Sequence, residues 1–227
     1  MPAVRGRLLV LAACLAVVAA TAWYAGSRFD PPAAAPSSGT VRLGPEPGED
    51  VAAYLARLPG ELPAPGTAVL ALVQLGAEVT PAEAAALVAG NARLVSVVFH
   101  VPMPRVQSAL RFVAVEPGPS AVAALDRARG HARFLADADA TRLTGRQAAV
   151  ASAEAAALAD PACRCVPAMV VAADRQALDA LAARPGVRAV HAAPAGVTPP
   201  ELALAPLLPE QRERADPIPD DGPVPPG

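Results

Sequence analysis

The sequence predicts an α+β domain that follows an N-terminal transmembrane helix and lies outside the cytoplasm. Three observations carry this prediction: an uncharged apolar run near the start, short apolar runs alternating with alanine-rich stretches in the middle, and proline-rich flanks. Strands that alternate with helices are typical of β-α-β units. Because 53% of the residues are hydrophobic but only 3% are aromatic, we expect a core of Leu, Val and Ala.

The apolar run covers residues 8–25 and follows Arg5 and Arg7. A helix of about 18 residues at 1.5 Å rise spans roughly 27 Å, which is enough to cross a bilayer core. Trp23 and Tyr24 lie at its far end, where amphipathic rings favour the membrane interface. The arginines keep the N-terminus in the cytoplasm under the positive-inside rule. We therefore expect residues 1–25 to anchor the chain in the lipid bilayer of the cell membrane as a single pass.

Two other interpretations of this segment stay open. Residues 20–22 (ATA) supply the small-x-small pattern of a signal-peptide cleavage site, which would make the protein secreted. Residues 11–14 (LAAC) resemble a lipobox with Cys14 as the acylated residue, although most of the apolar run follows that cysteine. All three interpretations place the body of the protein outside the cytoplasm.

Pro, Ser and Gly recur on both sides of the body, and such sequences do not sustain a helix or a sheet interior. We expect residues 26–48 to be a spacer and residues 197–227 to be an extended, mostly disordered tail. Residues 49–196 then form the folded domain.

The first half of that domain predicts five elements. They are a helix over 49–58, a strand over 67–76, a helix over 81–90, and strands over 93–101 and 106–115. The run TAVLALVQLG at 67–76 is continuous, which is typical of a strand buried on both faces. Thr80 and Glu83 form a capping box around Pro81, so the second helix begins there. The last two strands read as a hairpin.

The second half predicts two helices between 120 and 160, where Gly130 and Gly145 are the only breaks. A strand follows over 166–173. Asp174 then caps a helix that runs into Pro185-Gly186, and a closing strand covers 187–192.

These elements give two β-α-β units, over 67–101 and 166–192, in one mixed sheet with a long helical insertion between them. The simplest architecture is a ferredoxin-like arrangement with an additional unit. The stretch LDALAARPGVRAVHAAP resembles the closing β-α-β unit of subtilisin-propeptide-like domains. That resemblance implies the fold alone and no protease.

Cys163 and Cys165 are the cysteines of the exported body. In an oxidising compartment an even pair of cysteines usually forms a disulfide. A single residue separates them, so pairing closes a small ring, and the charge of Arg164 would lower the pKa of a neighbouring thiol. The pair has three interpretations: a structural role (buried thiols included) or an intermolecular bridge, a thiol-redox site, or metal ligands.

His100 and His191 each lie near the end of the closing strand of a β-α-β unit. If the two units pack as equivalents, the imidazoles meet at one end of the sheet. With a cysteine nearby they would form a soft-metal site, since imidazole and thiolate suit zinc or copper. The alternative is that both are ordinary residues at the rim of the sheet.

Several function classes lack their signatures. The net charge of −2 comes without a basic stripe, which argues against nucleic acid as a partner. The sequence has no phosphate loop, Gly-x-Ser-x-Gly elbow or His-Glu-x-x-His motif, so it nominates no catalytic residues and no cofactor.

The chain has no lysine, one isoleucine and one asparagine, the residues encoded by AT-rich codons, which indicates a high-GC genome. With its layout, this composition resembles uncharacterised single-pass membrane proteins of high-GC Gram-positive bacteria. The resemblance implies no activity. The architecture favours a non-catalytic domain that binds an envelope protein, and the alternative is an extracytoplasmic thiol-redox or metal-binding protein that uses Cys163 and Cys165.

Overall fold

The computed structural model describes residues 40–90 and 92–227. The expected anchor, with Arg5, Arg7, Cys14, Trp23 and Tyr24, and most of the expected spacer lie outside the described residues. In the part that is described, no helix combines the length and the apolar character needed to cross a bilayer.

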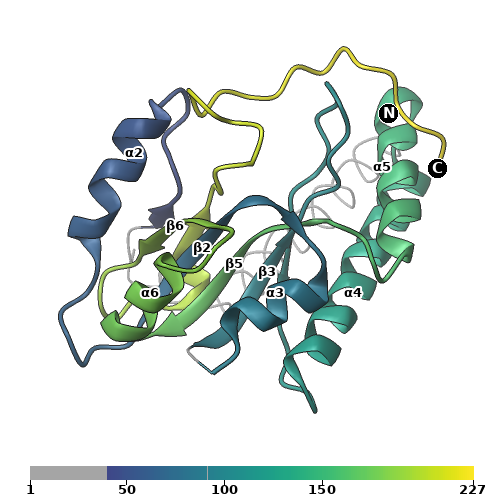
Figure 1. Ribbon diagram of the computed structural model, residues 1–227. Coiled ribbons are helices and arrows are strands. Elements are labelled where there is room, and N and C mark those ends of the chain that lie inside the picture. The colour runs from purple at the N-terminus through teal and green to yellow at the C-terminus, as the bar shows by residue number, and fades with distance from the viewer. Residues whose placement is uncertain (1–39, 91) are drawn as a thin grey trace, which may run out of the picture. The chain divides into compact units, whose positions relative to one another are not determined.

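A five-stranded sheet forms the centre of the domain (Figure 1). Its strands are β2 (Val69–Val79), β3 (Arg93–Phe99), β4 (Arg111–Ala114), β5 (Val166–Ala173) and β6 (Val187–Ala192). Their order is β4-β3-β5-β2-β6, and each neighbouring pair is antiparallel. With helices packed on this sheet, the predicted α+β class is confirmed.

The two predicted β-α-β units are present but interleaved. β2 and β3 run in the same direction with β5 between them, and β5 and β6 run in the same direction with β2 between them. Parallel pairing occurs in a separate two-stranded sheet of β1 (Val41–Leu43) and β7 (Leu202–Leu204). The predicted hairpin after β3 is also present, although its second strand is shorter than the expected 106–115.

Four helices cover one face of the sheet: α3 (Pro81–Val88), α4 (Ala121–Arg142), α5 (Gly145–Ala159) and α6 (Arg175–Ala182). The predicted caps hold, because the side chains of Thr80 and Asp174 accept hydrogen bonds from backbone N–H groups in the first turns of α3 and α6. The alanine-rich region makes the expected two helices, which separate before Gly145 rather than at Gly130. Between helices and sheet lies the main core, built mostly from Leu, Val and Ala as predicted.

The second face of the sheet is covered by segments from both ends of the domain. They comprise β1 and β7, α2 (Val51–Arg57), the 3-10 turn η1 (Leu58–Glu61) and the chain after β7. Leu70 and Leu72 on β2 pack here against Leu43, while Tyr54 packs against Leu207. Burial of β2 on both faces, which its continuous apolar run predicts, is therefore confirmed.

The expectation of a disordered tail over residues 197–227 is wrong for most of that segment. Leu207 is fully buried, and the backbone of Ala215 exchanges hydrogen bonds with Gly48 and Glu49. Figure 1 shows the segment in yellow as it passes from α2 to α5. The physical reason is that leucines alternate with prolines: the leucines fill the second face, and each proline lowers the entropy lost when extended backbone is ordered. Residues 40–48, expected to be spacer, also belong to the domain, because β1 pairs with β7.

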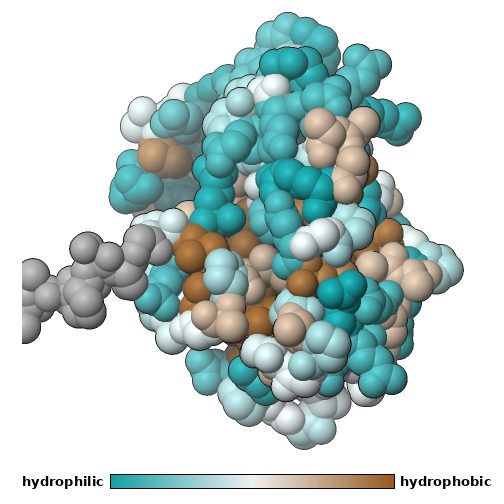
Figure 2. Space-filling view, turned by 90° about the vertical axis from the view of Figure 1, so that its left-hand side faces the viewer, coloured by the Kyte–Doolittle hydropathy of each residue, from teal (hydrophilic) through white to brown (hydrophobic). Residues whose placement is uncertain are grey.

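An apolar groove of about 180 Å³ opens beside β6, between α2–η1 and α6. Most of its lining residues are apolar, and the charged Asp179 and Arg188 also line it. Figure 2 views the molecule from this side and shows apolar atoms in the middle, surrounded by hydrophilic ones.

Candidate functional site

Polar side chains gather at two places on the second face of the sheet. The first, the His191 network, consists of Gly44, Tyr54, Gln74, His191 and Leu207. The second, the His100 cluster, consists of Glu78, His100 and Glu210.

The His191 network is a continuous path of hydrogen bonds. Gln74 is fully buried: its Nε2 donates to the Tyr54 hydroxyl at 2.8 Å, and its Oε1 accepts the backbone N–H of Leu207 at 2.7 Å. The Tyr54 hydroxyl lies 3.2 Å from Nδ1 of His191, which accepts the backbone N–H of Gly44 at 2.9 Å. The path therefore fixes both ends of the domain to β2 and β6.

The surroundings keep this network uncharged near neutral pH. Because the Gly44 amide can only donate, Nδ1 of His191 is an acceptor and the ring proton lies on Nε2, which is 3.4 Å from Glu61. Burial lowers the pKa of His191, with Glu61 opposing that effect. Burial also raises the pKa of Tyr54 to about 12. A neutral imidazole and a neutral phenol, both committed to hydrogen bonds, hold segments together rather than transfer protons.

A polar groove of about 370 Å³ adjoins His191. Its charged lining residues are Arg42, Glu46, Arg57 and Glu61. Arg57 donates to Glu61 at 2.8 Å, and its guanidinium lies 4.9 Å from the centroid of the Tyr54 ring. Arg42 lies 3.6 Å from Glu46. The groove thus presents both signs of charge side by side.

The His100 cluster lies at the end where β2 and β3 finish. His100 follows β3, and the alternation of side chains along a strand places it on the face of Val98, the second face. Its Nδ1 is 3.3 Å from a carboxylate oxygen of Glu78, and the imidazole is 2% exposed. Glu210 reaches the same place from the C-terminal segment. One ligand atom from each residue lies within 4.8 Å of the other two, which is a spacing that can hold a metal ion.

Cys163 and Cys165 form a disulfide with 5.4 Å between their Cα atoms. Cys165 is buried and Cys163 is partly exposed. The N–H of Cys165 donates to Val79, and the N–H of His100 donates to Cys165, so the backbone of the pair joins β2 to the end of β3. Both cysteines pack on the main core, which lies on the helical face of the sheet.

The predicted joint site of histidines and cysteines is therefore wrong. His100 and His191 belong to strands separated by β5 and β2, and three strand spacings amount to ~14 Å. The interleaving of the β-α-β units is the reason, because it places the two closing strands on opposite sides of the sheet centre. His100 donates a backbone hydrogen bond to Cys165, and the sulfur atoms of the two cysteines are joined to each other as a disulfide.

Arg164 also has a partner that sequence reasoning did not foresee. It lies 3.1 Å from Glu83, the acidic residue of the α3 capping box. Both side chains are more than 40% exposed, so the pair contributes little to stability.

Sequence reasoning missed Tyr54, Gln74 and Glu210 as members of polar clusters. A signal existed for Gln74, because a polar side chain inside a run buried on both faces must find a hydrogen-bond partner. Glu210 had no such signal, since it lies in a segment expected to be disordered.

Comparison of the chain with protein-family models, with curated proteins and with solved structures finds no match.

Proposed function

We propose that the protein is a membrane-tethered binding domain that works outside the cytoplasm, at the bacterial cell envelope, and takes an envelope protein as its partner. The observation that carries the proposal is the Cys163–Cys165 disulfide, in a chain whose N-terminus has two arginines before an apolar run. Disulfides persist in oxidising compartments and are rare in the reducing cytosol. The expected single-pass anchor supplies the tether.

Binding is favoured over catalysis because the buried polar groups of the His191 network and the Arg111–Glu154 pair already serve the fold. His191 and Tyr54 are neutral members of a hydrogen-bond path, and the buried Glu154 accepts hydrogen bonds from Arg111. A general acid or base works best when its pKa is near the working pH, whereas the pKa of Tyr54 is raised to about 12. The strand order with its split β-α-β units supports the ferredoxin-like arrangement, elaborated by β4 and by the α4–α5 hairpin.

The polar groove beside His191 is the surface that we assign to the partner. Its alternation of arginine and glutamate favours a partner with complementary charges, because such patterns select partners and orient them. Residues of η1 and β6 line both this groove and the apolar groove.

A photo-reactive amino acid placed at Arg42 tests this assignment in living cells. Arg133, exposed on α4 and remote from the groove, is the matched control. We expect ultraviolet light to give one discrete adduct with an envelope protein from position 42 and none of that mass from position 133. Identical adduct patterns from both positions would contradict the assignment.

A second candidate function is thiol–disulfide exchange, which the unequal exposure of Cys163 and Cys165 favours. A thiolate of a substrate dithiol attacks Sγ of the partly exposed Cys163, and the Cys165 thiolate leaves and takes up a proton. The second substrate thiol then attacks the mixed disulfide and releases Cys163, so the substrate is oxidised and the cysteine pair is reduced.

Titration of the free thiols of the protein, after incubation with a peptide dithiol and removal of the peptide, distinguishes the two candidates. The binding proposal predicts that the cysteine pair stays oxidised and that a C163S/C165S variant keeps the position-42 adduct. Stoichiometric appearance of two thiols with loss of the peptide's thiols supports exchange instead.

A further inference from the structure

We propose that Glu78, His100 and Glu210 bind one divalent metal ion of the zinc class. This site is independent of the proposed partner surface and of the location of the protein. It also differs from the metal site expected from the sequence, because neither cysteine takes part.

The geometry of the three side chains fits a small tetrahedral ion. Ligands at about 2.1 Å from zinc in a tetrahedral site lie ~3.4 Å apart. The contact between His100 Nδ1 and Glu78 is 3.3 Å, which already matches that edge. The third ligand atom, a carboxylate oxygen of the exposed Glu210, lies within 4.8 Å of both.

The donor set points to the same class of metal. One imidazole nitrogen with two carboxylate oxygens suits zinc and its neighbours, whereas calcium and magnesium prefer sites made of oxygen alone. Three protein ligands leave the fourth position to water, because the exposed side of the cluster is formed by Glu210.

The charge of the cluster supplies an independent argument. Glu78 has only 12% of its side chain exposed, and its partner is the imidazole of His100, 3.3 Å away. Glu210 forms no hydrogen bond or ion pair with any residue that the structure describes. Elsewhere in the domain a buried carboxylate has a guanidinium beside it, as Glu154 has Arg111. In the His100 cluster, two carboxylates converge on a buried imidazole and neither is paired with an arginine. Because buried charges are stable only when they are paired or coordinate a metal, a bound cation would balance their negative charge.

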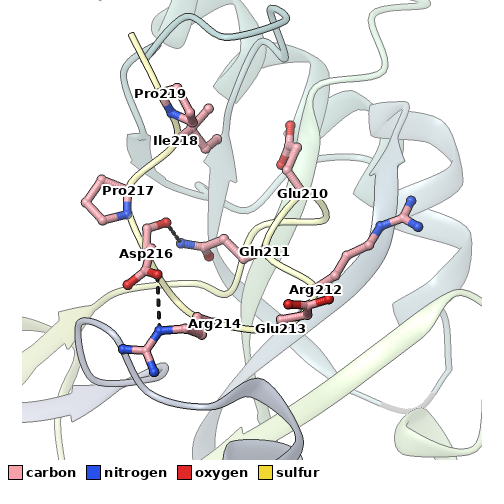
Figure 3. A pocket seen from close by; sticks show the side chains of 9 residues that line it. All are labelled: Glu210, Gln211, Arg212, Glu213, Arg214, Asp216, Pro217, Ile218 and Pro219. Carbon is pink, nitrogen blue, oxygen red and sulfur yellow. Dashed lines mark hydrogen bonds and ion pairs between the residues drawn. The ribbon is translucent and has the colours of Figure 1, made fainter.

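The local structure leaves Glu210 free for this role. Figure 3 shows the Glu210 side chain directed away from the neighbouring group in which Gln211 and Arg214 bind Asp216. Glu210 lies on the C-terminal segment, whereas Glu78 and His100 lie at the ends of β2 and β3. A bound ion would therefore fasten the segment to the sheet and stabilise the folded state.

The test uses the full-length protein in detergent, without a polyhistidine tag, stripped with a chelator under non-reducing conditions. Zinc chloride is titrated by calorimetry, and cobalt chloride is titrated with detection of the visible absorption of tetrahedral cobalt. We expect binding of one ion per chain and a Tm that rises with zinc. We expect E210Q to bind at least ~10-fold more weakly, since it removes a ligand.

E213Q is the matched control, because Glu213 is an exposed glutamate on the same segment and outside the cluster. It should bind zinc as the wild type does. E210Q and E213Q alter exposed side chains, so the apo forms of both should keep the wild-type Tm, and E78Q repeats the test from the sheet side. Absence of saturable binding, equal affinity of E210Q and wild type, or a preference for calcium over zinc would overturn the proposal.

Discussion

Gln74 and His191 carry much of the specificity of this fold at the scale of single residues. Each is buried on the second face, and each is joined to a segment from an end of the domain. A buried amide without partners would cost free energy, so the C-terminal segment is correctly placed only when Leu207 meets Gln74. Because each of these side chains needs its hydrogen-bond partners, substituting either one should measurably lower the stability of the folded state.

Gln74→Leu should lower the free energy of unfolding by about 2–4 kcal/mol, because it leaves the Leu207 N–H unpaired and removes the donor to Tyr54. Urea denaturation measures the change. Gln147→Leu, at an exposed position of α5, is the control and should stay within about 0.5 kcal/mol of the wild type. Equal stabilities of the two variants would show that the network contributes nothing.

The lowered pKa of His191 predicts a loss of stability in mild acid. The unfolded chain takes up a proton at the ordinary pKa of 6.5, whereas the folded protein does so only at lower pH. Protons therefore favour the unfolded state as the pH falls below about 6.5, and the free energy of unfolding falls with it. The charged groups that act on the His191 imidazole are Glu61, Arg57 and Glu49. The pKa of Glu49 is lowered from its ordinary value of 4.5. The stabilisation that its negative charge gives the folded state is therefore lost only in stronger acid, where the carboxylate takes up a proton.

Urea denaturation at pH 7.5 and pH 5.5 measures this effect. His191→Gln should show a smaller decline between the two pH values than the wild type, because the titrating group is gone. His131→Gln, at an exposed position of α4, should decline as the wild type does. An unchanged decline in the His191 variant would contradict the assignment.

At the scale of elements, the pairing of β1 with β7 fastens the two ends of the domain to each other. Gly44 makes this pairing possible: its φ is +125°, and a Cβ there would lie 1.7 Å from the carbonyl oxygen of Ala205. Beside it, the N–H of Ala205 donates to Leu43 at 2.8 Å. The close approach of two backbones therefore depends on the missing side chain.

Gly44→Ala should cost ~3 kcal/mol or more, because β7 must move away from β1. Gly66→Ala separates the clash from backbone strain, since Gly66 also has a positive φ (+83°) but a Cβ there would meet nothing within 4 Å. That control should cost ~1–2 kcal/mol. A similar decrease in the free energy of unfolding in both variants would argue against the close contact between Gly44 and Ala205.

The α4–α5 hairpin is joined to β4 by a buried ion pair. Arg111 donates to Glu154 of α5 and to Asp139 of α4, and Glu154 also accepts the N–H of Ala109 at 2.6 Å. Removing one partner of a buried pair leaves the other charge uncompensated.

Glu154→Ala should therefore lower the free energy of unfolding by about 3–5 kcal/mol. Arg142→Ala removes an exposed partner of Asp139 and should cost less than about 1 kcal/mol. Chemical denaturation of both variants checks the contrast, which would disappear if the hairpin were only loosely attached.

At the scale of the whole molecule, the sequence predicted the elements better than their arrangement. Hydrophobic periodicity and capping residues are local, so the strands at 67–76 and 166–173 and the caps at Thr80 and Asp174 could be predicted. The interleaving of the two β-α-β units is non-local, and it keeps His100 and His191 apart. His100 was predicted as a metal ligand, but the carboxylates around it were not. Glu210 could not be predicted as a ligand because its segment, which is rich in proline, was expected to be disordered.

The location of the protein can be measured in its native host, from the intact mass of the mature chain and its partition between membrane and medium. We expect the full-length mass in the membrane fraction, with the domain digested by protease added to intact cells. A chain beginning near Trp23 in the medium would contradict the tether, and a full-length chain protected inside intact cells would contradict the envelope location itself.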